Sequence, residues 1–272
     1  MRASEWIQIG FSLGLAVLAW VRPLSLGRRL RIAMLAMIVP GAILAARYVL
    51  DGVVGSVVRD WLPAALLLVP YWQAGQFFTR PNPRIEAWLG GIDAKVMRRL
   101  ALARGTGESG AWATYFESAY LLCYPLVPIG LAVLYLAHQR PAADFYWIVV
   151  VLASDICFAA TIFVPAMPPR LVEGVGTNSA LSGNDVRKLN LEVLNRGSIQ
   201  AITFPSAHVA STMAAALVVM RFLPMPGAIF LAIAVSIAIG AFLGRYHYFL
   251  DVVTGAAEAA IVFVACVWLF RP

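Results

Sequence analysis

Long apolar runs separated by short polar segments make up most of this 272-residue chain. A transmembrane helix needs about 20 mostly apolar residues to cross the hydrocarbon core of a bilayer. The pattern therefore predicts an all-α polytopic membrane protein with about eight transmembrane helices. The expected spans are 6–21, 32–50, 61–78, 119–137, 146–165, 205–221, 227–243 and 250–270. We interpret the short first span as a retained anchor, because arginines and no cleavage-site pattern follow it.

Two connections between the expected spans are long enough to carry structure of their own. Between 79 and 118, apolar residues recur at helical spacing opposite a basic face, which predicts an amphipathic helix at about 83–103. Such a helix suits the membrane interface, and packing on the protein's own loops is an equally good interpretation. The second connection, 170–198, is polar and rich in Asn and Gly, and we expect it to cover a site.

The overall composition supports the membrane interpretation. Hydrophobic residues make up 61% of the chain and charged residues only 13%, whereas about 25% charged residues are typical of soluble domains. The three cysteines are scattered through apolar runs, which argues against a disulfide framework or a cysteine metal site. The net charge of +7 points to anionic membrane lipids and topology signals rather than to nucleic acid.

The histidines give the first indication of chemistry, because the chain has only three. His138 lies in a short polar loop. His208 and His247 lie at the beginnings of the spans 205–221 and 250–270. An even number of crossings separates these two helix starts, so both histidines face the same side of the membrane. Arg170 follows the span 146–165, and the same count places it on that side.

These groups fit the needs of phosphoryl transfer without a metal or another cofactor. Arginine guanidinium groups and helix N-termini stabilise phosphate charge. A neutral imidazole can attack phosphorus while a carboxylate one helical turn away fixes its tautomer, and a second imidazole can protonate the leaving oxygen. The expected phosphate ligands are Arg170, Arg245 and Ser206, and the expected reacting groups are His247, Asp251 and His208.

Two short motifs resemble a known family. Pro205-Ser206-Ala207-His208 is similar to the P-S-G-H motif of the type-2 phosphatidic-acid phosphatase and haloperoxidase superfamily, and His247-x-x-x-Asp251 is similar to the end of its third motif. The resemblance implies that His247 is the nucleophile, Asp251 orients it and His208 is the general acid. It also implies a six-helix catalytic core over 61–272, with residues 1–60 adding two N-terminal helices.

The chain departs from the family pattern in the cationic positions. Gly240-Ala241 stands where the third motif has Ser-Arg, and Arg245 is our candidate substitute. For the arginine of the first motif we favour Arg170, and the pair Lys188 and Arg196 ranks second.

Residues 245–251 also resemble the H-Y-F-x-D segment of the inositol phosphorylceramide synthase branch, as does the Ala-Met-Pro-Pro stretch before Arg170. This resemblance implies transfer of a phospho-headgroup between lipids, since a phosphodiester needs fewer cations than a phosphomonoester. A lipid phosphate phosphatase is the close alternative. A transporter or scaffold with a degenerate pocket is the third.

Further polar residues lie within or beside the expected spans. Glu258 is two turns beyond Asp251 on the same helical face, and acids inside membranes face the bundle interior. Two interpretations of Glu258 are equally good: it supports the site, or it is a hydrogen-bonded packing group between helices. We consider Glu117 and Tyr120 as residues that could touch substrate, and Asp155 as a structural group.

The sequence leaves the orientation in the membrane and the oligomeric state open. With eight spans, all but six of the 21 lysines and arginines fall on the side of the site. The positive-inside rule makes that side cytoplasmic, whereas the family resemblance implies an extracytoplasmic site.

Overall fold

The computed structural model describes residues 1–104, 110–172 and 185–270, and every regular element in these ranges is a helix. The helices α1 to α7 are Ala3–Val21, Leu26–Tyr48, Gly52–Leu66, Leu68–Phe77, Pro83–Arg104, Gly110–Leu121 and Leu126–Leu136. A short 3-10 helix, Arg140–Ala142, precedes α8. The helices α8 to α13 are Ala143–Thr161, Pro169–Val172, Asp185–Gly197, Ala207–Phe222, Pro224–Leu243 and Phe249–Phe270.

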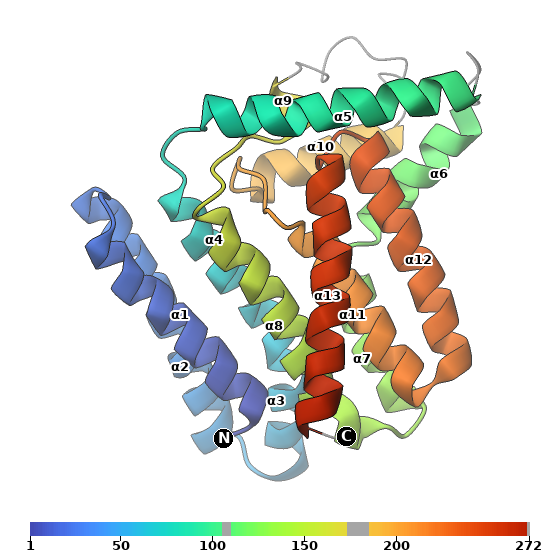
Figure 1. The fold of residues 1–272 in the computed structure, drawn as a ribbon. Coiled ribbons are helices and arrows are strands. Elements are labelled where there is room, and N and C mark those ends of the chain that lie inside the picture. Colours follow the sequence, from blue (N-terminus) through green and yellow to red (C-terminus); the bar gives the residue numbers. More distant parts are fainter. Residues whose placement is uncertain (105–109, 173–184, 271–272) are drawn as a thin grey trace.

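Six of the eight predicted spans are long, apolar helical segments in the structure. They are α1, α2, the consecutive helices α3 and α4, the segment Arg140–Thr161 that contains α8, α12, and α13. The chain is therefore an integral multi-pass membrane protein. Figure 1 shows most of these helices running side by side between the two ends of the bundle.

The other two predicted spans differ from expectation, so eight full-length spans is too many. The single helix predicted over 119–137 is wrong, because α6 and α7 meet at an angle of 69°. Pro125, at the break, lacks the N–H that a continuous helix would use, and its ring restricts the preceding residue. α11 has only 16 residues. In the part of the chain that the structure describes, the count of long apolar spans is six, or seven if the bent pair is one span.

α8 is the central helix of the bundle. Most of its residues are buried, and it packs against α11, α1, α13 and α4. Because α8 is apolar on nearly all sides, it is suited to be surrounded by protein. α11 and α13 also pack against each other, so their N-termini lie together at one end of the bundle.

α5 lies across that same end of the bundle (Figure 1). It occupies the segment for which the sequence predicts an amphipathic helix. Its inner face includes the buried residues Leu89 and Asp93, and it contacts α13. Its outer face is basic and also exposes Trp88.

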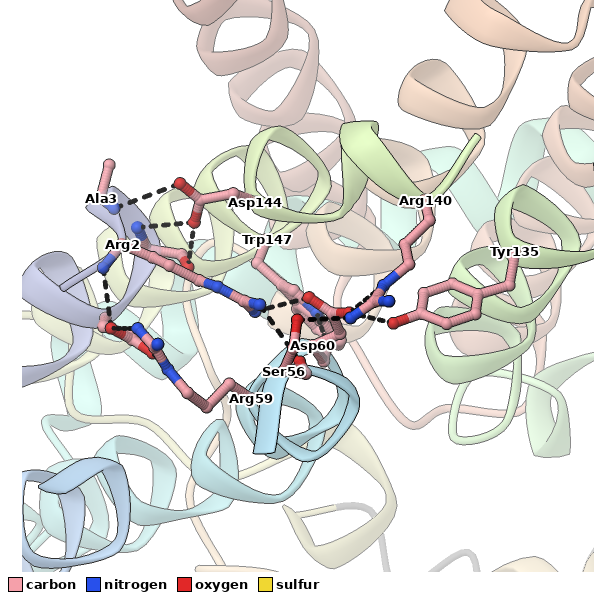
Figure 2. Close-up of polar contacts among 11 residues, drawn as sticks. Arg2, Ala3, Ser56, Arg59, Asp60, Tyr135, Arg140, Asp144 and Trp147 are labelled. Atoms are coloured by element: carbon pink, nitrogen blue, oxygen red, sulfur yellow. Dashed lines mark hydrogen bonds and ion pairs between the residues drawn. The ribbon is translucent and has the colours of Figure 1, made fainter. Parts of the chain in front are cut away.

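A polar cluster around Asp60 joins four helices at the opposite end of the bundle (Figure 2). The Asp60 carboxylate forms ion pairs with Arg2 at 2.6 Å and Arg140 at 2.8 Å, and it accepts a hydrogen bond from Tyr135. The indole N–H of Trp147 donates to the Asp60 carbonyl at 2.6 Å. A buried carboxylate needs such partners, since its desolvation is costly.

The start of α1 is held by two further carboxylates in the same region (Figure 2). Arg59 donates from Nε and Nη2 to Glu5, each at 2.7 Å. Asp144 accepts from the backbone N–H groups of Ala3 and Ser4, both at 3.2 Å. These contacts fix α1 to α3 and α8, and hence to the helix on which the rest of the bundle packs.

We expect Asp60→Ala to destabilise the folded protein, because it removes the shared partner of two arginines. The cost should be about 2 kcal/mol or more in free energy of unfolding, and it should appear as a lower melting temperature in detergent. Asp51→Ala is the matched control, since Asp51 is exposed and makes no side-chain capping bond. Equal melting temperatures for the two variants would contradict a stabilising role for the cluster.

Candidate active site

His247 and Asp251 form the centre of the candidate site at the N-terminus of α13. His247 Nδ1 lies 2.9 Å from Asp251 Oδ2, across one helical turn. Both side chains are buried, and that of Asp251 is completely inaccessible. A carboxylate in this position requires the proton on Nδ1, which leaves the Nε2 lone pair available.

His208 faces that available nitrogen from the first turn of α11. Its Nδ1 lies 3.4 Å from His247 Nε2, which is long for a hydrogen bond. The rings of Tyr120 and Tyr124 pack against His208, with centroids 5.9 Å and 5.6 Å away. The two histidines predicted to share one face are therefore neighbours.

A close approach between α13 and the segment before α11 sets this geometry. A side chain on Gly255 would place its Cβ 2.7 Å from the Ser206 carbonyl oxygen, so only glycine fits there without a shift. The Ser206 N–H donates to the Asp251 carbonyl at 2.9 Å. The fully buried Ser206 hydroxyl caps α11 by accepting a bond from Val209 N–H. Ser206 thus lies in the predicted cluster, with its polar atoms bonded to protein.

Arg170, on the short helix α9, lines the same small pocket as His208 and His247. Its side chain is buried, and among the described residues no carboxylate forms an ion pair with it. Burial lowers the pKa of its guanidinium, and nearby tyrosine hydroxyls oppose that shift. These tyrosines are Tyr71, Tyr120, Tyr124 and Tyr246. A buried cation without a carboxylate partner suits an anionic ligand.

Arg245 lies next to the site and is engaged with a residue that the sequence analysis did not select. Its Nη1 forms an ion pair with Asp93 of α5 at 2.6 Å. Asp93 also accepts from the Phe249 N–H at 2.8 Å, at the start of α13. The Arg245 carbonyl accepts from Arg170 N–H at 2.9 Å. Asp93 and Arg245 therefore tie α5, α9 and α13 together around His247.

The structure does not bring Lys188 and Arg196 to the histidines. Both lie on exposed parts of α10, where Lys188 pairs with Asp185 and Arg196 with Glu192. Their side chains are 63% and 81% exposed. The spacing of Lys188 and Arg196, which nearly matches the first family motif, is therefore a surface feature of an amphipathic helix.

Glu117 and Tyr120 support the site from α6 in different ways. Glu117 is buried and binds Arg187 of α10 at 2.6 Å and the Tyr246 hydroxyl at 2.5 Å. Tyr120 stacks on Tyr246, with centroids 4.0 Å apart, and lines the pocket beside His208. Glu117 thus holds the loop before His247 in place, and Tyr120 is close enough to touch a ligand.

Glu258 and Asp155 lie away from the histidine pair. Glu258 accepts a long contact from the Cys157 thiol of α8, at 3.9 Å. Asp155 is buried, and neither of its carboxylate oxygens has a hydrogen-bond partner among the residues that the structure describes. Of the predicted residues, Arg170, His208, His247 and Tyr120 line the pocket. Glu258 and Asp155 lie instead on α13 and α8, which pack against each other.

Several residues that the fold brings to the site carry no recognisable signal in the sequence. Asp93 reads in sequence as part of the polar face of an amphipathic helix. The pocket is also lined by residues without a motif around them, including Tyr71, Ser198 and Thr203. Tyr71 lies on α4, and Ser198 and Thr203 lie in the segment between α10 and α11, so no local pattern identifies them.

Within the described ranges, no group of three or more histidine, cysteine, aspartate or glutamate side chains is arranged to hold a metal ion. The polar side chains at the pocket are imidazole, guanidinium, phenol and hydroxyl groups, with one carboxylate behind His247.

This arrangement defines a class: a polytopic helical membrane protein with two facing histidines, a supporting carboxylate and an arginine around one pocket. The chain belongs to the PAP2 superfamily, whose sequence model matches residues 85–265. Membership indicates a phosphatase-type enzyme of phosphoryl transfer, with lipid phosphates as the suggested substrates. No match was found among curated proteins or among solved structures. The likeness to the inositol phosphorylceramide synthase branch stays a prediction.

We expect His247 to remain neutral in mildly acidic solution. Burial, followed by the positive charge of Arg170, lowers its pKa from the ordinary histidine value to about 3. At about pH 6 an exposed histidine is mostly protonated, whereas His247 should keep one proton, on Nδ1. Nitrogen-15 NMR of histidine-labelled protein measures this, with the His247 signal identified by its loss in His247→Gln. Titration of that signal above pH 6 would contradict the expectation.

Proposed function

We propose that this protein is an integral membrane enzyme that transfers a phospho-headgroup from one lipid to an acceptor through a phosphohistidine at His247. The observation that carries the proposal is Arg170: a buried guanidinium with no carboxylate ion pair among the described residues, in one pocket with two histidines. Membership of the PAP2 superfamily supports phosphoryl transfer at the level of the whole class.

In the first step, His247 Nε2 attacks phosphorus as the bond from phosphorus to the leaving oxygen breaks. The leaving oxygen takes a proton from His208, and the phosphorylated imidazole gains positive charge. Asp251, hydrogen-bonded to Nδ1 at 2.9 Å, stabilises that charge. The chemistry requires His208 to enter this step protonated and to leave it neutral.

In the second step, neutral His208 removes a proton from the acceptor hydroxyl. The acceptor oxygen bonds to phosphorus, and the phosphorus–nitrogen bond to His247 breaks. Both histidines return to their starting protonation states. Water as acceptor gives hydrolysis, whereas a lipid alcohol gives transfer, so the same residues serve both reactions. No metal takes part in either step of the proposed mechanism.

The number of cations beside the histidines supports transfer over simple phosphatase activity. Arg245 is ion-paired with Asp93, and Lys188 and Arg196 lie on the surface of α10. Arg170 is then the main positive group available to the phosphate. A phosphodiester carries less charge than a phosphomonoester and needs fewer fixed cations.

The pocket between these side chains is small, about 20 Å³. Since a single water needs roughly 10–15 Å³ measured in this way, a phosphate group requires the lining side chains to separate. The long contact between the two histidines is compatible with such a movement, because little hydrogen-bond energy opposes it.

We expect His247→Ala to lose essentially all turnover and His208→Ala to lower kcat by about 10²–10⁴-fold, the usual contribution of a general acid. Purified variants should keep the melting temperature of the parent protein to within a few degrees. His138→Asn is the matched control: His138 is exposed and has a φ of 58°, which asparagine tolerates. A fully active His247→Ala protein would overturn catalysis at this site and favour a transporter or scaffold.

Product analysis should separate transfer from hydrolysis. We expect a labelled phospho-headgroup to move from a donor phospholipid to a lipid alcohol in mixed micelles, and turnover to persist in EDTA. Vanadate should inhibit, since it mimics five-coordinate phosphorus. Fast release of inorganic phosphate from phosphatidic acid without headgroup transfer would leave the phosphatase as the correct alternative.

A further inference from the structure

The outer face of α5 carries positive charge that no ion pair in the described part of the chain balances. The exposed cations on this helix are Arg84, Lys95, Arg98 and Arg99. Among the described residues, no carboxylate forms an ion pair with any of them. Like charges that lie one or two helical turns apart repel one another. The face therefore favours an anionic partner that lies along the helix.

Three of these cations share one side of the helix with an exposed tryptophan. At 3.6 residues per turn, residues 84, 88, 95 and 99 fall within about 60° of one another around the helix axis. Trp88 is 54% exposed. Lysine and arginine beside an indole ring are typical of helices that lie in the membrane interface, where the cations meet lipid phosphates.

Exposed aromatic side chains on neighbouring helices indicate where the membrane–water boundary lies. Trp20, near the end of α1, is 53% exposed, and Trp112, near the beginning of α6, is 62% exposed. Both helix ends belong to the end of the bundle that carries α5 (Figure 1). Trp and Tyr are enriched at the level of the lipid headgroups. The boundary therefore passes close to α5, within reach of its long basic side chains.

The inner face of α5 supports the two segments that carry the candidate site. Asp93 pairs with Arg245 at 2.6 Å, two residues before His247. Glu86 Oε1 accepts a hydrogen bond from the Met167 N–H at 2.9 Å, three residues before Arg170. The position of α5 is thereby linked to the segments that hold the nucleophile and the phosphate-binding cation.

We propose that the outer face of α5 binds anionic lipid headgroups of the surrounding bilayer, and that this contact activates the enzyme by holding Glu86 and Asp93 against the site. The bound lipids are separate from the substrate at His247. An α5 in the observed position presents all its cations to the headgroups, so anionic lipid favours that position over a displaced one. The binding surface stands on the contacts of α5 alone, whereas activation rests on the proposed function.

A fluorescent label on α5 tests lipid binding without turnover. Gly91 is exposed on the outer face, and a side chain there would meet no atom within 4 Å. The three native cysteines are buried, so a dye attached to Gly91→Cys is specific. The labelled protein, in the His247→Ala background, is reconstituted in phosphatidylcholine nanodiscs with increasing phosphatidylglycerol. We expect a blue shift of the dye that grows with phosphatidylglycerol and is reversed by about 1 M salt, which screens charges beyond about 3 Å.

Two sets of substitutions separate charge from shape. Arg84→Gln, Lys95→Gln, Arg98→Gln and Arg99→Gln together form the neutral variant. Arg84→Lys, Arg98→Lys and Arg99→Lys together form the matched control, which keeps every charge. Each cation near an anionic surface strengthens binding roughly fivefold. We therefore expect the phosphatidylglycerol-dependent shift to fall about tenfold or more in the neutral variant and to persist in the control.

The proposed lipid surface is overturned by an equal shift in the neutral variant, or by an equally large shift in pure phosphatidylcholine. The absence of any shift in the charged protein would also overturn it and would leave the face to water or to an acidic protein.

Activity tests the link from α5 to the site, with the protein in the same nanodiscs and a fixed fraction of labelled donor phospholipid. We expect phosphatidylglycerol to raise headgroup transfer about fivefold or more in the parent protein and the lysine control. The neutral variant should keep the parent's rate in pure phosphatidylcholine and gain nothing from phosphatidylglycerol. A lipid-dependent shift of the dye without this activation would overturn the regulatory link. If the parent protein turns over no donor, the proposed function fails, and the fluorescence still decides the lipid surface.

Discussion

The structure around the candidate site depends on the hydrogen bonds that meet at Asp251. Its carboxylate holds His247, and its carbonyl accepts from the backbone of Ser206, at the start of α11. One residue thereby fixes the orientation of the first imidazole and the position of the helix that carries His208. Because both bonds are buried, water does not compete for them, and loss of either one leaves a polar group without a partner. The glycine at position 255 is a condition for this arrangement, since it lets the two segments approach.

The buried arginines near this site differ in whether they form ion pairs with carboxylates. Arg187 and Arg245 are buried near the site, and each forms an ion pair with a carboxylate of another helix, Glu117 and Asp93. Such pairs hold elements together because separating them would leave a charge buried alone. Arg170 is surrounded by phenol groups instead and forms no carboxylate ion pair within the described residues. Arg170 therefore carries a positive charge that no ion pair among the described residues balances, as the proposed phosphate binding requires.

The sequence predicted the features that depend on local pattern. Apolar length identified the membrane helices, and the histidines could be placed together because each begins a span. The bend at residues 122–125 was missed because a run of apolar residues indicates burial but does not indicate the direction of the helix axis. Pro125 and Pro128, which lie in that run, were present in the sequence. The partner of Arg245 could not be found, since Asp93 is 152 residues away in the chain. Lys188 and Arg196 had nearly the right spacing, but that spacing also fits an exposed helix with local ion pairs.

The shortness of α11 has a consequence for access to the reaction. Sixteen residues span about 24 Å, whereas the hydrocarbon core of a bilayer is about 30 Å thick. α11 is enclosed by α7, α8, α12 and α13, so it can be short without exposing its ends to lipid. Its C-terminus joins α12 directly at Leu223, and its N-terminal turn carries His208. α11 therefore presents His208 within the helical bundle, beside His247 of α13, rather than at a helix end surrounded by lipid.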